Sequence, residues 1–82
     1  MDDKADFYLD ITGEVCPMTF VRAKLVVERM LPGQTAEVRL AGKEPLANVP
    51  RSLAPLGVDI ADPVAEPGAG PEGVHRLRIR KR

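Results

Sequence analysis

The sequence is short of the residues that many catalytic, metal-binding and disulfide-bonded sites require. Its 82 residues include no tryptophan, one tyrosine, two phenylalanines, one histidine and one cysteine. A single cysteine excludes an internal disulfide, a Cys-x-x-Cys redox pair and a zinc site built from several cysteines. With no disulfide framework to maintain, the expected compartment is the reducing cytoplasm.

The chain also lacks net charge and long apolar runs. Twelve basic residues balance twelve acidic ones, so no overall charge attracts the protein to nucleic acid or to a membrane surface. No run of about 18 apolar residues could cross a bilayer, and Met1-Asp2-Asp3 is unlike the start of a signal peptide. The hydrophobic content of 44% favours a folded chain, and the length predicts one small domain over residues 1–82.

What the sequence does contain is regular patterning. Alternation of apolar and polar residues predicts four half-buried strands, at about residues 7–11, 36–41, 58–60 and 74–82. In the last of these, His75, Leu77 and Ile79 share one face, and three arginines share the other. Those arginines are expected to lie on an open sheet face, paired with acidic residues of neighbouring strands: Asp10, Glu37 and Asp59.

Two segments have helical spacing instead. Residues 17–31 carry an apolar stripe with Arg22 and Arg29 on the opposite side, and Pro32-Gly33 predicts the end of this helix. In the second segment the prolines would interrupt a helix, so we expect a turn near Pro45 and only a short helix over about 50–56. The Pro/Gly-rich stretch 61–73 has little to bury and predicts a mobile loop.

These elements predict the order βαβαββ. Each strand has one apolar and one polar face, so helices should cover only one side of the sheet. The first crossover implies parallel neighbouring strands, and the last loop implies a hairpin. The predicted fold is a two-layer α/β sandwich, with a mixed four-stranded sheet and two helices on one face.

The candidate functional residue is the single cysteine, Cys16, which is followed directly by Pro17. A proline at the first helical position would make Cys16 the N-cap, beside unpaired backbone N–H groups at the positive end of the helix dipole. Such positions lower the pKa of a thiol, and the thiolate is the nucleophile. Gly13 is expected to let the preceding turn bend without side-chain bulk. A purely structural cysteine that seals the core remains the alternative.

The residues around Cys16 also resemble a known family. Gly-x-x-Cys-Pro at residues 13–17, an amphipathic helix, Pro32-Gly33, a strand and then Glu44-Pro45 and Val49-Pro50 resemble the TusA/SirA family of small sulfur carriers. The resemblance covers about residues 7–81. It implies that Cys16 carries sulfane sulfur as a persulfide, that Pro17 starts the helix, and that Arg22 and Glu44 occupy family positions.

The resemblance further implies partners and no cofactor. The expected partners are a sulfur donor, such as a cysteine desulfurase or a rhodanese-like protein, and a sulfur acceptor. The sequence departs from the family's Cys-Pro-x-Pro motif at Thr19, and Met18 replaces an acidic residue often found there. Met18, Val21 and Leu25 are the residues expected to dock a partner.

The remaining expectations are mostly negative. No metal site and no membrane contact are expected. Direct nucleic-acid binding is not expected either, because no aromatic platform accompanies the arginines. His75 is interpreted as a packed residue and not as a base for Cys16. The protein is expected to be a monomer. A second hypothesis from another class is a regulatory or protein-binding module whose Cys16 senses redox state or is only structural.

Overall fold

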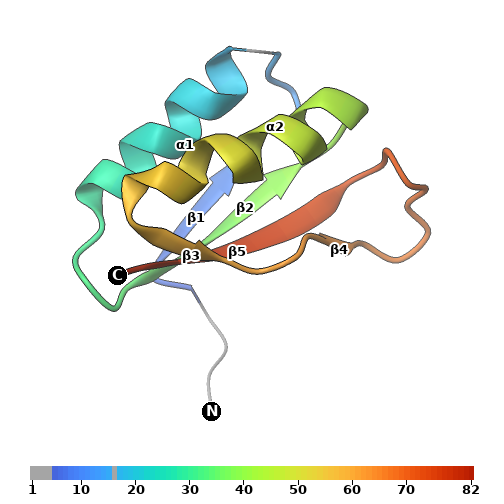
Figure 1. The fold of residues 1–82 in the computed structure, drawn as a ribbon. Helices are drawn as coiled ribbons and strands as arrows, with labels where there is room; N and C mark the ends of the chain where they lie inside the picture. The colour runs from blue at the N-terminus through green and yellow to red at the C-terminus, as the bar shows by residue number, and fades with distance from the viewer. Residues whose placement is uncertain (1–4, 16) are drawn as a thin grey trace.

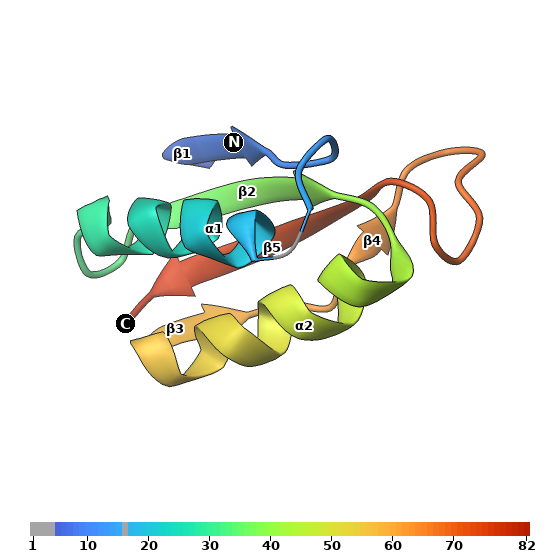
Figure 2. The ribbon, with the colours of Figure 1, turned by 90° about the horizontal axis from the view of Figure 1, so that it is seen from above.

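The computed structural model describes residues 5–15 and 17–82, and it forms two layers (Figure 1). Two helices, α1 (Met18–Arg29) and α2 (Lys43–Leu53), lie side by side on one face of a mixed β-sheet (Figure 2). The other face of the sheet carries no helix in the described part of the chain (Figure 1). The predicted two-layer arrangement with one open sheet face is therefore confirmed.

The sheet has five strands, one more than predicted. They are β1 (Phe7–Asp10), β2 (Thr35–Leu40), β3 (Val58–Ile60), β4 (Val64–Ala65) and β5 (His75–Lys81). The hydrogen-bonded order is β1-β2-β5-β3, and β4 pairs with β5. The β1–β2 pair is parallel and the pairs made by β5 are antiparallel, as the crossover and the hairpin predicted.

The core lies between the sheet and the helices. Strands β2 and β5 alternate strictly, so Val38, Leu77 and Ile79 point into the core while their sequence neighbours point to the open face. Helix α1 contributes Ala23 and Val27 from the predicted apolar stripe. The remaining buried apolar side chains include Ile11, Leu40, Val49, Leu53 and Val58.

Helix α2 corrects the prediction for the proline-rich segment. A single helix runs from Lys43 to Leu53, and the short 3₁₀ helix Ala54–Leu56 follows it. Pro45 lies in the first turn, where its missing N–H has no intrahelical partner to lose. Pro50 costs one hydrogen bond inside the helix, and the burial of Val49 and Leu53 against the core offsets that cost.

The stretch predicted to be a mobile loop contains β4. Val64 pairs with Arg76 and Ala65 with His75, and the backbone N–H of Glu66 donates to the carbonyl of Val74 at 3.0 Å. The Pro/Gly composition therefore concealed a short edge strand that folds back along β5.

Candidate functional site

The candidate site is the connection from β1 to α1, which contains Cys16. Cys16 itself lies outside the described residues, so its side chain is not placed. The connection begins with a turn in which the N–H of Glu14 donates to the carbonyl of Ile11 at 3.1 Å. Its last residues are open to solvent, since Val15 is 73% exposed and Pro17 is also exposed. The sequence position of the cysteine is thus flanked on both sides by exposed residues.

Helix α1 begins one residue later than predicted. Pro17, with φ −90° and ψ 4°, is the N-cap residue and Met18 is the first helical residue. The carbonyl of Pro17 accepts the N–H of Val21 at 3.1 Å, a hydrogen bond with helical spacing. The prediction that Cys16 is the N-cap and Pro17 the first helical residue is therefore wrong by one position. Cys16 precedes the cap in sequence.

The first amides of α1 are satisfied by the connection itself. The carbonyl of Val15 accepts the N–H of Met18 at 2.8 Å and that of Thr19 at 3.4 Å. Thr19 is fully buried, and it is the only polar residue among the buried ones in the described part of the chain. The sequence identified Thr19 as a variable motif position, but the structure makes it part of the packing under the site.

An ion pair that the sequence analysis missed joins the connection to α1. Glu14 Oε2 accepts a hydrogen bond from Arg22 Nη1 at 2.7 Å, with both side chains partly exposed. Arg22 was identified only through the family resemblance, and Glu14 was not identified at all. Eight residues separate them in sequence, so only the position at which the helix begins brings them together. The pair ties the Cys16-containing connection to the second turn of α1.

Gly13 has no steric role in the structure. Its φ is not in the left-handed region, and a Cβ built at this position would meet nothing within 4 Å. The prediction that this turn needs the absence of a side chain is therefore not supported. A Cβ is therefore accommodated at position 13.

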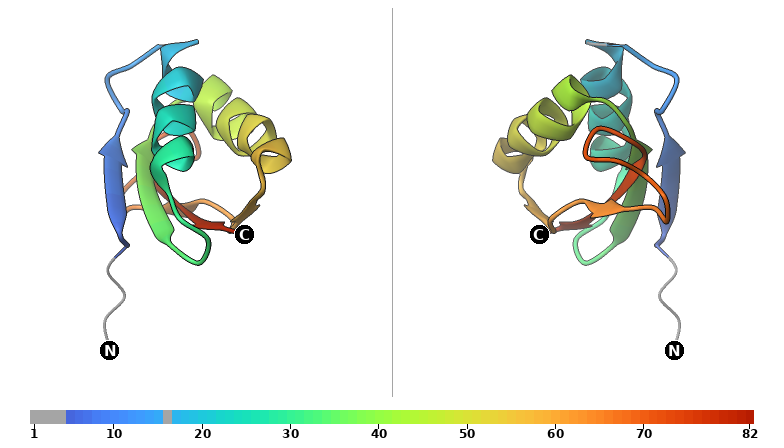
Figure 3. Two further views of the ribbon diagram at one scale, coloured as in Figure 1. Left: turned by 90° about the vertical axis from the view of Figure 1, so that its left-hand side faces the viewer. Right: turned by 90° about the vertical axis from the view of Figure 1, so that its right-hand side faces the viewer.

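The N-termini of both helices lie at the same end of the sheet. Each helix follows one of the two parallel strands, so both begin at the carboxyl ends of β1 and β2 (Figures 1 and 3). Glu44 is exposed in the first turn of α2, where a negative charge is favourable. The positive ends of two helix dipoles thus face the end of the molecule that contains the Cys16 connection.

The predicted docking residues form an exposed apolar strip on α1. Met18, Val21 and Leu25 are 44%, 37% and 53% exposed. They follow one another along the helix at spacings of three and four residues, which places them on one side. The strip starts at the helix N-terminus, directly after Pro17.

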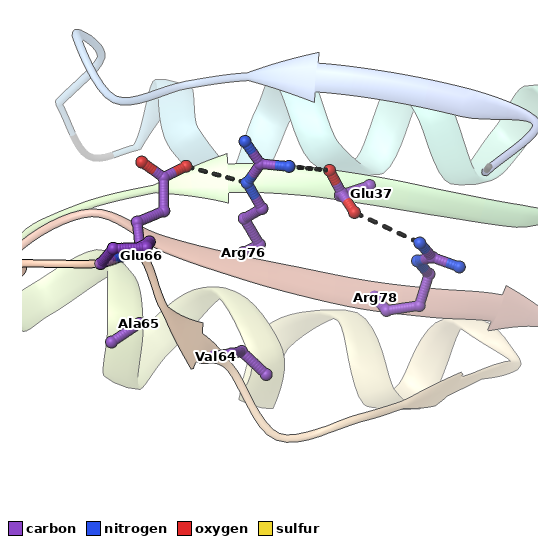
Figure 4. Close-up of a pocket in the computed structure, with 7 residues that line it drawn as sticks. Glu37, Val64, Ala65, Glu66, Arg76 and Arg78 are labelled. Carbon is purple, nitrogen blue, oxygen red and sulfur yellow. Dashed lines mark hydrogen bonds and ion pairs between the residues drawn. The ribbon is translucent and has the colours of Figure 1, made fainter. Parts of the chain in front are cut away.

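The uncovered face of the sheet forms a second candidate region, which is stabilised by ion pairs. A hollow of about 530 Å³ there is lined by Val64, Ala65, Pro67 and four charged side chains (Figure 4). Arg76 bonds to Glu66 and to Glu37, at 2.9 and 3.1 Å, and Arg78 bonds to Glu37 at 3.3 Å.

These contacts confirm the expected pairing of β5 arginines with Glu37. Asp10 and Asp59, the other expected acceptors, pair with Arg39 and Arg82. Sequence reasoning missed Glu66, which binds Arg39 through both carboxylate oxygens, at 2.8 and 3.1 Å. Hydrogen bonds from Arg39 and then Arg76 lower the pKa of Glu66 to about 2. Most charged residues of this face are thus engaged in ion pairs with one another.

His75 bonds within its own segment. It is half-buried at the start of β5, and its Nδ1 lies 2.8 Å from the carbonyl oxygen of Gly73. No three acidic, histidine or cysteine side chains of the described residues are grouped to hold a metal ion. Within residues 5–15 and 17–82, no helix has the length and apolar character needed to span a membrane.

Comparison with known proteins identifies the family. The family model for the sulfurtransferase TusA matches residues 7–81, which is nearly the whole chain. The chain belongs to the TusA family. A protein of Archaeoglobus fulgidus named "Putative sulfur carrier protein" is 39% identical to it over 57 residues, or 70% of this chain. The match spans 65% of that relative's own length.

A solved structure supports the fold of this TusA-family chain. The crystal structure of a SirA-like protein from Desulfitobacterium hafniense superposes with a TM-score of 0.73, covering 90% of this chain and 95% of the other. The two sequences are 21% identical, so the likeness concerns the fold alone. The predicted resemblance to the TusA/SirA family is confirmed, by the sequence matches and by the shared fold.

Proposed function

We propose that this protein is a sulfur carrier that holds sulfane sulfur as a persulfide on Cys16 and passes it to a partner protein. The observation that carries the proposal is the position of Cys16: between exposed Val15 and Pro17, directly before α1, in a chain that matches the TusA family over residues 7–81. An exposed connection suits a thiol that must meet another protein's sulfur. The relative's name as a sulfur carrier supports the same role.

The transfer is a thiol–persulfide exchange with no net oxidation. The Cys16 thiolate attacks the outer sulfur of a donor persulfide, and the donor's sulfur–sulfur bond breaks. The donor leaves as a thiolate and takes up a proton from solvent, while Cys16 keeps the transferred sulfur as a persulfide. An acceptor thiolate then attacks that outer sulfur, and Cys16 leaves as the thiolate. The proposed partners are therefore proteins with reactive cysteines.

The electrostatics of the site favour this chemistry. A thiolate and a persulfide anion are both negative, and the N-termini of α1 and α2 present partial positive charge at the same end of the molecule. The carbonyl of Val15 satisfies two amides of α1, so a direct hydrogen bond to those amides is not part of the proposal. The pKa of Cys16 is expected to lie below the value of about 8.5 for a free thiol.

Intact mass spectrometry after incubation with a sulfane-sulfur donor tests the proposal. The protein should gain about 32 Da per sulfur atom, and reduction should remove the gain. Cys16→Ser is the matched control, since it changes one atom and should abolish loading while the melting temperature is retained. A wild-type protein that gains no sulfur would instead favour the module whose cysteine is redox-sensing or structural.

A further inference from the structure

A groove between α1 and β1 has both an apolar floor and a single sign of charge. It has a volume of about 220 Å³ and is lined by Leu9, Arg22, Leu25, Val26 and Arg29. Leu25 and Val26 lie between the two arginines along α1, and Arg22 and Arg29 are about two helical turns apart. No acidic residue is among these lining residues, although Arg22 is partly neutralised by Glu14 beside it.

The groove runs along the free edge of the sheet. Strand β1 is the terminal strand of the hydrogen-bonded order, as the left panel of Figure 3 shows. The backbone N–H of Ile11 donates to the carbonyl of Arg39, at 2.8 Å, which fixes the side of the strand that faces β2. Because backbone groups alternate along a strand, the N–H and C=O of Tyr8 and Asp10 point to the outer edge. That edge can accept another extended segment.

We propose that this edge and groove bind an extended acidic–aliphatic segment of the protein that exchanges sulfur with Cys16. The segment adds as a strand beside β1 and directs every second side chain toward α1. An aliphatic side chain lies over Leu9, Leu25 and Val26, and carboxylates on either side of it bind Arg22 and Arg29. The assignment deepens the proposed function, on which it rests only for the identity of the partner.

The spacing of the two arginines determines which sequence pattern the bound segment needs. Arg22 and Arg29 are seven residues apart on α1, which is about 10.5 Å along the helix axis. In an extended segment, groove-facing residues at positions 1 and 5 are about 13 Å apart. Flexible arginine side chains cover the small difference, so the pattern Glu-x-Leu-x-Glu matches both cations and the apolar floor. This pattern is symmetric, and it suits either direction of the added strand.

The partner's position on the groove also serves the proposed sulfur transfer. The groove shares Leu25 with the exposed strip Met18–Val21–Leu25, which leads along α1 to the Cys16 connection. A segment held beside β1 therefore binds next to the exposed strip that leads to the helix N-terminus. The charged residues that line the hollow on the open sheet face are already paired with one another, so they select less strongly for a partner's charge.

Binding of a synthetic peptide, acetyl-Thr-Glu-Thr-Leu-Thr-Glu-Thr-amide, to the ¹⁵N-labelled protein tests the proposal. In an NMR titration, the amide signals of Tyr8, Asp10 and Leu25 should shift the most. Arg29→Glu should weaken binding about tenfold or more, which corresponds to about 1.4 kcal/mol. The matched control is Arg51→Glu, the same change at an exposed residue of α2 whose side chain bonds to Asn48. It should bind like the wild type.

Charge exchange sharpens the test. A peptide with both glutamates replaced by lysine should bind the wild type at least about tenfold more weakly, and Arg29→Glu should narrow that difference. Three results would overturn the proposal. They are equal affinity of the wild type for the two peptides, an equal loss of affinity in Arg29→Glu and Arg51→Glu, and amide shifts confined to the open sheet face. Cys16→Ser should bind the acidic peptide normally. Sulfur loading without peptide binding would refute the groove alone, and peptide binding without loading would refute the carrier function alone.

Discussion

The two faces of the sheet show two different ways of using the same strands. On the covered face, side chains such as Val38 and Leu77 are fully buried against the helices. On the open face, their sequence neighbours Glu37, Arg76 and Arg78 form a chain of ion pairs, which Glu66 extends through Arg76 (Figure 4). Burial of apolar area stabilises the fold strongly, whereas exposed ion pairs contribute little. The covered face therefore determines stability, and the open face can vary at low cost.

The comparison also clarifies where function resides. Neither face presents a reactive group among the described residues, because one is sealed and the other is neutralised by its own pairs. The candidate functional site lies instead at the end of the sheet, in the connection from β1 to α1. That connection is exposed, but it is held at Arg22 by Glu14 and at the helix start by the Val15 carbonyl.

The largest expected effect comes from removing a side chain on the covered face. Leu77→Ala deletes a fully buried side chain from β5 and should lower the free energy of unfolding by about 3 kcal/mol. In a chain of this size, the melting temperature should fall by more than about 12 °C. Arg78→Ala, one residue away on the open face, should cost less than about 1 kcal/mol. Thermal melts that gave similar losses for both variants would contradict the assignment of stability to one face.

A smaller effect is expected at the polar residue buried on the covered side. Thr19→Pro should reduce the free energy of unfolding by about 1–2 kcal/mol while the fold is kept. The variant loses the hydrogen bond from the Thr19 N–H to the carbonyl of Val15, which at 3.4 Å is long, and must fit a ring into a fully buried position. Circular-dichroism melts measure the change. Thr19→Ser keeps both the N–H and the hydroxyl, so it should lose less stability, and the reverse order would remove this explanation.

The alternation of apolar and polar residues predicted the strands, because burial of one sheet face requires an apolar residue at every second position. The positions of Leu77 and Ile79 against Arg76 and Arg78 followed directly from this period of two. The same reasoning failed for α2, where two prolines concealed a continuous helix. Propensity treats each proline as a helix breaker, but one proline falls in the first turn and the other costs a single bond. Tertiary packing decided the outcome there.

The residues that surround the candidate site were less predictable than its position in the sequence. The sequence identified Cys16 and its neighbours through the motif, but it placed the cap one residue too early. Whether the cap is Cys16 or Pro17 depends on the backbone angles of Pro17 and on the Val15 carbonyl, which no local rule fixes. Glu66 could not be anticipated either, because its partner Arg39 lies 27 residues away and only the fold of β4 along β5 joins them.

The smallest expected effect on global stability, and the most local one, concerns Glu66 on the open face. Its carboxylate accepts hydrogen bonds from Arg39 and Arg76, which lower its pKa from 4.5 to about 2. A lowered pKa means that the folded state binds this proton less readily than the unfolded state does. The stabilisation is therefore present above the ordinary pKa of 4.5 and is lost as the pH falls toward about 2.

The expected outcome is that acid releases β4 from the sheet before the core unfolds. As the pH falls from about 4.5 to about 2, hydrogen exchange at the Glu66 amide, which bonds to Val74, should accelerate relative to amides of β2 such as Val38. Glu66→Gln carries no titratable carboxylate at this position, so its β4 amides should exchange faster already at neutral pH and lose most of this acid dependence. If wild type and variant instead responded to acid in parallel, the charges of the open face would not be what holds β4 against β5.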